Sequence, residues 1–405
     1  MTLAVYVHIP FCTVKCGYCD FNAYAGMDSL KGVYAHALVA EVDAWRDLLA
    51  SRTVTSVSFG GGTPGEFPAS SVAAVLDAIR RTTTVDAGAE ISLEANPGTV
   101  TAAYLADLRQ AGVTRFSIGA QSFDAGELRF LDRIHSPEAS AQAVALARDA
   151  GFESVSLDLI YGLPNQPLAS WHATLDRAIA LHPDHISCYA LTVEEGTPLA
   201  SRVADGTVPA PDPDLAADMF EYARGQLAAR EYRHYELSNW ARPGHESRHN
   251  LVYWSGGDYL GIGAGAHGFI DGWRYENIAH PRAYIAAVKA GQPTCRPPLV
   301  GPAIAGAAQP PRTTAMFDWL ETHLRLVDGF APADFAAAFG VGLDAAVGPA
   351  LAECAAAGLV EDGQCGRVRL TARGQLLHSE VCARLLIGIE EFQRTAVPTP
   401  FPLTP

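Results

Sequence analysis

The alternation of short apolar runs with amphipathic segments constrains this 405-residue chain more than any other feature. Six runs rich in β-branched and aromatic residues are predicted as strands, and the stretches between the first five carry a helical period. This alternation predicts a parallel sheet covered by helices. The predicted strands are Leu3–His8, Val54–Phe59, Glu90–Ala95, Arg115–Ala120, Ser154–Ile160 and His185–Leu191. The predicted helices are Tyr34–Leu49, Ser70–Arg81, Ala102–Ala111 and Pro137–Ala150.

The alternation becomes looser after about Thr192, where a Pro-rich loop precedes a predicted helix over Asp214–Arg230. The segment 293–312 is too rich in Pro, Gly and Ala for a regular element, so it is predicted to be a linker. We therefore expect one large domain over residues 1–292, the linker over 293–312 and a smaller domain over 313–405.

The composition bounds the class of protein. A hydrophobic fraction of 49% in 405 residues is enough for a large core. The formal net charge of -15 disfavours binding to nucleic acid or to an anionic membrane, because both require excess Lys and Arg. No apolar run approaches the roughly 20 residues of a membrane span, so no stable membrane insertion is expected.

Three closely spaced cysteines, Cys12, Cys16 and Cys19, are the most informative functional feature. Three thiolates can hold three irons of a [4Fe–4S] cluster and leave the fourth iron open to a small molecule. A zinc site completed by His8 is an alternative, although no second cysteine pair lies nearby. Disulfides need an oxidising compartment, and no secretory signal precedes the cysteines, so a cytoplasmic protein is expected. The remaining cysteines are predicted to be core or incidental thiols: Cys188, Cys295, Cys354, Cys365 and Cys382.

The CxxxCxxC pattern, with Tyr18 just before the last cysteine, resembles the radical S-adenosylmethionine (SAM) superfamily. The flanking residues YVHIPFC and CDF resemble its anaerobic coproporphyrinogen-III-oxidase-like branch, which contains the oxygen-independent oxidases and the HemW-type haem chaperones. The resemblance implies a partial, open (β/α)6 barrel with a smaller C-terminal helical, winged-helix-like domain. It also implies a [4Fe–4S] cluster and SAM as cofactors.

Several residues at predicted strand ends match positions that the resemblance assigns to SAM. The glycine-rich turn after the second strand could equally be an ordinary tight turn, and each polar residue alone could be a satisfied residue at a barrel rim. Arg133 is expected on the helix after the fourth strand, and Glu94 is expected to accept hydrogen bonds from the ribose. The residues implied to contact SAM are Tyr6, Tyr18, Gly61, Gly62, Thr63, Glu94, Gln121, Arg133 and Asp158.

Two departures separate the two groups within the branch. The oxygen-independent oxidases resemble CxxxCxxCxC, whereas this chain has Phe21 in place of the fourth cysteine. Those oxidases also usually carry a longer segment before the first strand, which here begins at Leu3. Both differences favour resemblance to the HemW-type chaperone.

The segment His249 to Trp254 matches HNxxYW, which resembles the haem-associated motif of HemW-type proteins. A haem needs an axial ligand, apolar or aromatic surface and cations for its propionates. His249, the aromatic pair Tyr253 and Trp254, and Arg248 offer these groups. His249 could instead be a hydrogen-bonded structural residue. His245 and His267 are then the competing iron ligands.

The leading hypothesis is a chaperone that binds haem, a [4Fe–4S] cluster and SAM and passes haem to an acceptor protein. The resemblance implies this function, whereas the cysteine spacing alone implies only an open-site cluster. Coproporphyrinogen oxidase activity is not expected. The alternatives are an oxygen-independent coproporphyrinogen III oxidase, or a radical SAM enzyme that acts on another tetrapyrrole.

Overall fold

The computed structural model describes residues 1–291, 299–363 and 366–395. Its contacts divide the chain into two compact units. The first unit consists of Met1–His234, Ser238–Tyr253 and Gly257–Ala308, and the second consists of Tyr235–Leu237, Trp254–Gly256 and the chain from Gln309 onward.

A twelve-stranded sheet forms the centre of the first unit, counted over the described residues, with the order β14-β13-β12-β11-β1-β4-β5-β6-β7-β8-β10-β9. The six central strands from β1 to β8 run parallel, with Tyr6 of β1 beside Ser58 of β4 and Phe59 of β4 beside Leu93 of β5. These strands are β1 (Thr2–Ile9), β4 (Thr53–Gly61), β5 (Thr84–Ala95), β6 (Arg115–Gln121), β7 (Ser154–Tyr161) and β8 (His185–Ala190). The α/β architecture predicted from the sequence is therefore confirmed.

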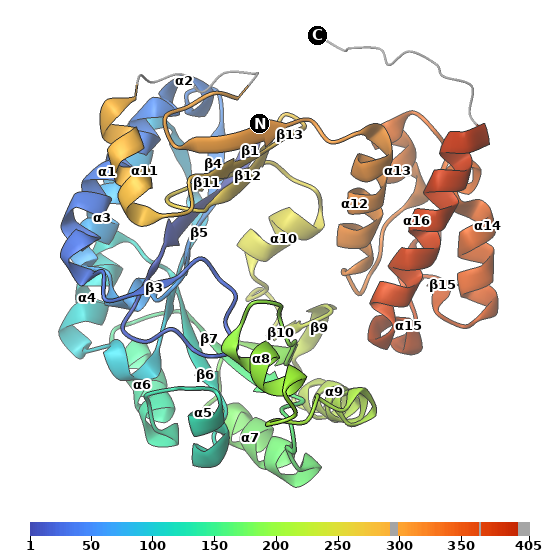
Figure 1. Cartoon of the computed structure of the whole chain (residues 1–405), viewed down its shortest axis with the longest axis horizontal. Coiled ribbons are helices and arrows are strands. Elements are labelled where there is room, and N and C mark those ends of the chain that lie inside the picture. The colour runs from blue at the N-terminus through green and yellow to red at the C-terminus, as the bar shows by residue number, and fades with distance from the viewer. Residues whose placement is uncertain (292–298, 364–365, 396–405) are drawn as a thin grey trace. The chain divides into compact units, whose positions relative to one another are not determined.

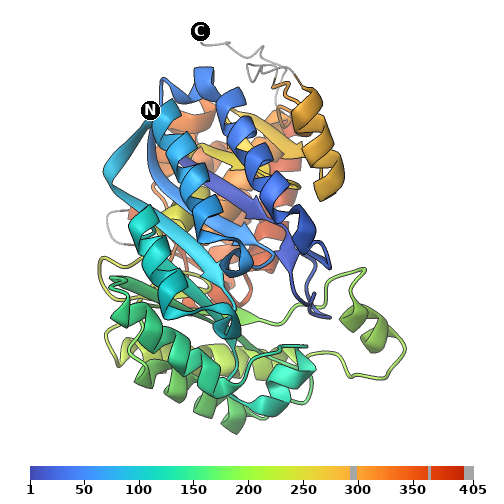
Figure 2. The same ribbon diagram turned by 90° about the vertical axis from the view of Figure 1, so that its left-hand side faces the viewer.

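Helices between the parallel strands cover one face of the sheet, and Figure 2 shows them in front of the strands. Helix α3 illustrates the cause, because its buried residues Val72, Val75, Leu76 and Ile79 follow the spacing of one helical face. The predicted helix over 34–49 is divided at Trp45, which is buried in the core. The covering helices are α1 (Lys31–Ala44), α2 (Arg46–Leu49), α3 (Ala69–Thr82), α4 (Ala102–Ala111), α5 (Ala125–Phe130), α6 (Pro137–Asp149) and α7 (Leu168–Ala180).

The sheet continues beyond the predicted strands at both edges. Strand β11 (Tyr259–Ile262) is parallel to β1, and β12 (His267–Ile270), β13 (Trp273–Asn277) and β14 (Ile304–Ala308) follow as antiparallel neighbours. At the other edge stand β10 (Asn239–Ala241) and β9 (Arg233–Glu236). The remaining α-helices before the second unit are α8 (Pro198–Ala204), α9 (Pro213–Ala228), α10 (Arg248–Trp254) and α11 (Pro281–Ala290) (Figure 1).

Strand β14 corrects the prediction that 293–312 contains no regular element. Residues Ile304–Ala308 pair with β13 despite their small side chains, because an edge strand needs only backbone hydrogen bonds on one side. Residues 292–298, including Cys295, lie outside the described part of the chain. Cys365 also lies outside it, whereas Cys188, Cys354 and Cys382 are buried free thiols, as predicted.

The second unit is mainly helical. Its core contains Leu320, Phe335, Val347, Leu385 and Ile389, which are all fully buried. A short antiparallel pair, β15 with β16, lies between α14 and α15. Its elements are α12 (Arg312–Leu324), α13 (Pro332–Phe339), α14 (Leu343–Ala356), β15 (Val360–Asp362), β16 (Val368–Leu370), α15 (Ala372–Leu376) and α16 (His378–Thr395). Across the described residues, no helix combines the length and the apolar character needed to cross a membrane.

Candidate cofactor site at the strand ends

The three cysteines lie in the loop that leaves the carboxyl end of β1. Cys12 ends the short strand β2 (Phe11–Cys12), and Cys16 and Cys19 follow before β3 (Tyr24–Ala25). All three are free, half-buried thiols, and the N–H of Cys19 donates to the carbonyl of Cys16 at 3.1 Å. Within the described residues, no three His, Cys, Asp or Glu side chains converge as ligands of a single metal ion.

Contacts from three distant segments hold this cysteine loop. The N–H of Gly17 donates to Asp132 Oδ2 at 3.0 Å, and the carbonyl of Gly17 accepts from the N–H of Leu199 at 2.8 Å. The Thr63 hydroxyl donates to Cys12 Sγ at 3.3 Å. The position of the loop therefore depends on residues that are more than 50 and more than 180 positions further along the chain.

His8 is a structural residue that joins β1 to the end of the loop. Its Nε2 donates to the carbonyl of Asn22 at 2.9 Å, so its Nδ1 accepts from the Tyr6 hydroxyl at 3.0 Å. Burial lowers the pKa of His8 and keeps the ring neutral. Because both ring nitrogens are occupied, His8 is not available as the ligand that a zinc site would need.

Asn22 is itself anchored through a buried carboxylate. Its Nδ2 donates to the carbonyl of Ala264 at 2.9 Å. The neighbouring N–H of Gly263 donates to Glu41 Oε2 at 2.8 Å, and the Tyr284 hydroxyl donates to the same carboxylate at 2.6 Å. The turn after β11 thus packs against α1 and holds the end of the cysteine loop.

The glycine-rich turn after β4 is tightly packed within the protein. Gly61 has φ +108°, and a Cβ there would overlap the ring of His8. A Cβ on Gly62 would lie 2.7 Å from the carbonyl oxygen of Phe11. The N–H groups of Gly62 and Thr63 already donate to the carbonyls of Ile9 and Phe11, both at 2.8 Å. Internal packing therefore accounts for these glycines, as the alternative of a tight turn predicts.

Two carboxylates, Glu94 of β5 and Asp158 of β7, lie near enough for the charge of Asp158 to act on Glu94. Glu94, near the end of β5, remains in contact with solvent, yet the surrounding protein raises its pKa to about 8, first by desolvation and then through the charge of Asp158. Desolvation also raises the pKa of Asp158, although it accepts hydrogen bonds from Ser187 at 2.7 Å and Ser117 at 3.0 Å. A pair of carboxylates at these strand ends suits a ligand that carries hydroxyl or cationic groups.

Arg133 brings several predicted residues together. Its Nη1 lies 3.8 Å from Cys16 Sγ, and its Nη2 donates to the carbonyl of Gly119 at 2.8 Å and to Asn96 Oδ1. Tyr18 also forms a side-chain hydrogen bond with Arg133. Contrary to the prediction, Arg133 lies in the loop between α5 and α6 rather than on a helix.

Gln121 ends β6 with φ +64°, so the strand turns sharply at this residue. A Cβ on Gly119 would lie 2.8 Å from Gln121 Nε2 and 3.0 Å from Arg133 Nη2. The glycine therefore leaves room for both side chains at the same strand end.

Asn96 is a site residue that the sequence analysis missed. Its Nδ2 donates to the Thr63 hydroxyl at 3.2 Å, and its Oδ1 accepts from Arg133. A continuous chain of contacts thus leads from Cys12 through Thr63, Asn96 and Arg133 to Cys16. Its place two residues after Glu94, at the same strand end, is the signal that could have identified it.

His249 is buried rather than open to a ligand. It is 2% exposed, its Nδ1 lies 3.0 Å from Ser56 Oγ, and its Nε2 lies 2.7 Å from the Tyr253 hydroxyl. Burial lowers its pKa to about 3. Its ring lies 6.3 Å from the ring of Tyr6, so α10 reaches the interior of the first unit. This geometry matches a hydrogen-bonded structural residue, which is the alternative to haem ligation.

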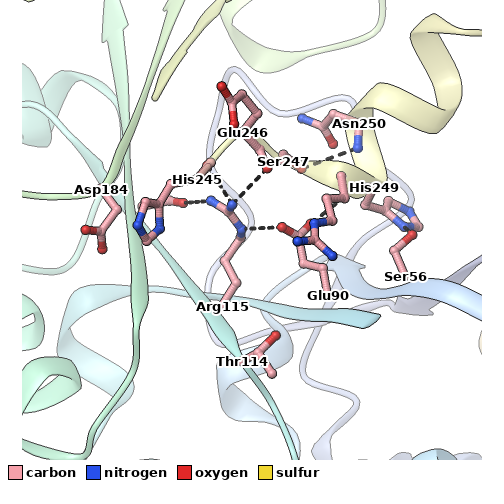
Figure 3. Close-up of polar contacts among 12 residues, drawn as sticks. Ser56, Glu90, Thr114, Arg115, Asp184, His245, Glu246, Ser247, His249 and Asn250 are labelled. Carbon is pink, nitrogen blue, oxygen red and sulfur yellow. Dashed lines mark hydrogen bonds and ion pairs between the residues drawn. The ribbon is translucent and has the colours of Figure 1, made fainter. Parts of the chain in front are cut away.

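A buried ion pair fixes the segment before α10 (Figure 3). Arg115 pairs with Glu90 at 2.8 Å and donates to the carbonyl of His245 at 2.6 Å. Glu90 in turn accepts from the N–H of His249 at 3.2 Å. His245 is half-buried and His267 is exposed. Trp254, the last motif residue, belongs to the second unit, where it lies beneath Arg325 at 4.3 Å.

A cysteine loop at the first strand end of a curved parallel sheet defines a radical SAM protein, and two family models match this chain. The model of the radical SAM superfamily covers residues 6–178, and that of the HemN C-terminal domain covers residues 311–377. The chain is 44% identical to heme chaperone HemW of Mycobacterium tuberculosis H37Rv, over 71% of this chain and 74% of that protein. It is 42% identical to heme chaperone HemW of Escherichia coli K12, over 70% and 75% of the two chains. The chain therefore belongs to the HemW family of radical SAM proteins.

A solved structure shows the same fold over nearly the whole chain. The radical SAM enzyme coproporphyrinogen III oxidase (HemN) of Escherichia coli matches with a TM-score of 0.80 and 26% identity. The match covers 95% of this chain and 89% of that one.

Proposed function

We propose that this protein is a haem chaperone that binds haem, a [4Fe–4S] cluster and SAM and transfers haem to an acceptor protein. The presence of Phe21 is the observation that favours a chaperone over an oxidase. Phe21 replaces the fourth cysteine of the oxidase pattern, and its side chain is 61% exposed beside the cysteine loop. The identity of 42–44% with two proteins named heme chaperone HemW supports the same choice.

Cys12, Cys16 and Cys19 are the residues that would hold the cluster. Three free thiols on one loop suit a cluster with an open iron, because each thiolate binds one iron. Burial raises the pKa of the Cys12 thiol to about 11, so the positive charge of the irons must stabilise the thiolate form.

SAM would bind along the strand ends beside this loop, chelating the open iron. Glu94 and Asp158 would accept hydrogen bonds from its hydroxyl groups, and Tyr6 would line the same interior. Arg133, Gln121 and Tyr18 would contact the remaining parts of the SAM molecule. Gly61, Gly62 and Thr63 would shape the wall of the site. The N–H groups of Gly62 and Thr63 would not contact SAM, because they already donate to carbonyls within the protein.

Haem ligation by His249 would require a local rearrangement. Both of its ring nitrogens have partners, so an iron could bind only after the contact with Ser56 or Tyr253 breaks. His249 remains the first candidate because of its motif. The exposed His267 is the second, because its ring needs no such change.

A second candidate function is oxygen-independent coproporphyrinogen III oxidation, which the fold similarity to HemN favours. The test is anaerobic reconstitution of the cluster, followed by a haem titration and a coproporphyrinogen assay with SAM and a reductant. The chaperone should bind haem and leave coproporphyrinogen unchanged. Turnover of coproporphyrinogen by the wild type would overturn the proposal in favour of the oxidase.

A further inference from the structure

Glu66 places a buried negative charge beside the cysteine loop. It ends the short 3-10 helix Pro64–Glu66 in the turn after β4, and its side chain is only 8% exposed. Neither of its carboxylate oxygens has a hydrogen-bond partner. A buried carboxylate without partners is costly, so its presence here calls for a role.

The neighbouring cation leaves this charge only partly balanced. Lys31 Nζ lies 3.9 Å from Glu66 Oε2, which is beyond hydrogen-bond distance. The same Nζ lies 2.6 Å from Asp28 Oδ1, so Asp28 is its closer partner. Arg133, the other nearby cation, donates to Asn96 and to the carbonyl of Gly119 and contacts Cys16.

Glu66 is close to two of the three cysteines. Thr63, three residues earlier, donates its hydroxyl to Cys12 Sγ and its N–H to the carbonyl of Phe11. Glu66 also lines a cavity of about 10 Å³ with Cys16, Asn96 and Arg133. This space holds about one water-sized group, so Glu66 does not belong to a separate substrate pocket. In agreement with this geometry, the charge of Glu66 contributes to the raised pKa of the Cys12 thiol.

We propose that the Glu66 carboxylate lowers the reduction potential of the cluster held by Cys12, Cys16 and Cys19. This inference rests on the proposed function, because it requires the cluster. One-electron reduction by an external reductant makes the cluster more negative, and a nearby fixed negative charge opposes that change. The effect is stronger for a buried charge than for an exposed one, because solvent and ions screen it less.

The experiment is a potentiometric titration of the reconstituted full-length protein, followed by visible absorbance, with iron and sulfide analysis of every variant. Glu66→Gln and Glu66→Leu both remove the charge, and Leu adds no new hydrogen-bond donor. Both should raise the midpoint potential. Lys31→Met removes the partial counter-charge and should lower it. Asp20→Asn is the matched control, because Asp20 is an exposed carboxylate next to Cys19.

The Asp20→Asn control should raise the midpoint potential by less than either Glu66 variant does. Potentials for Glu66→Gln and Glu66→Leu that equal the wild-type value, or move no further than the control, would overturn the inference. If neither Glu66 variant retains a cluster, Lys31→Met decides, and an unshifted or higher potential would overturn the inference. A wild-type protein that incorporates no cluster would refute the proposed function and this inference with it.

Discussion

Arg133 Nη1 lies 3.8 Å from the Sγ of Cys16, although 117 positions separate the two residues in the chain. The same guanidinium contacts Asn96, which donates to Thr63, which in turn donates to Cys12. Two of the three cysteines are thus joined through side chains from two strand ends and from the loop between α5 and α6. The loop is therefore organised by the tertiary structure as well as by its own short sequence.

Arg133→Met should weaken this organisation while the fold is retained. The change removes donors to Cys16, Asn96 and Gly119, and each lost hydrogen bond is worth about 0.5–1.5 kcal/mol, or 1.5–3 kcal/mol where a charged group takes part. We expect a lower cluster content and weaker SAM binding, measured by iron analysis and by calorimetry. Arg177→Met, at a partly exposed arginine outside the site, is the control. Unchanged iron content together with unchanged SAM affinity would contradict the expectation.

Replacing Cys12, Cys16 or Cys19 with Ser should abolish the broad visible absorbance of the anaerobically reconstituted protein. Each thiolate is proposed to bind one iron, and a serine hydroxyl is a poor substitute. Cys188→Ser is the control, because Cys188 is a fully buried core thiol. A triple variant that keeps all its iron and sulfide would refute the ligand assignment.

Glu94→Ala should weaken SAM binding by about 1–3 kcal/mol, roughly one to two lost hydrogen bonds, and leave the cluster spectrum unchanged. Asp158→Asn should also weaken binding, and it should bring the pKa of Glu94 down, because the Asp158 charge contributes to its rise. Calorimetry on the reconstituted variants measures the first effect. An unaltered affinity for Glu94→Ala would exclude this strand end from the SAM site.

His249→Ala should destabilise the first unit by about 1–3 kcal/mol, because it removes the hydrogen bonds of the imidazole with Ser56 and Tyr253. The thermal unfolding midpoint of the cluster-free protein measures this change. The same variant, together with His267→Ala, identifies the haem ligand through the haem absorption spectrum. A shift in His249→Ala but not in His267→Ala would support His249, and the opposite pattern would assign His267.

The buried imidazole of His249 also predicts a pH dependence of stability. Its pKa falls from 6.5 to about 3 on folding, so the unfolded state binds a proton more readily between these values. Stability should therefore decrease as pH falls below about 6.5, by about 2 kcal/mol at pH 5 from this residue. His249→Phe should remove this part of the dependence, as measured by thermal unfolding at pH 7 and pH 5. Equal pH sensitivity of the two proteins would contradict the burial of a neutral His249.

The sequence by itself determined a parallel sheet, four of the helices that cover it and the loop that carries the cysteines. These features depend on local hydrophobic period and on spacing, which are visible in one chain. The antiparallel extension at β14 was missed, because Ile304–Ala308 pairs through its backbone and shows little side-chain pattern. Only the tertiary structure decided that His249 is buried between Ser56 and Tyr253, that Asn96 links Thr63 to Arg133, and that Glu66 is buried beside Cys16. The burial and hydrogen bonding of a polar side chain depend on neighbours that are distant in sequence, so no local pattern reveals them.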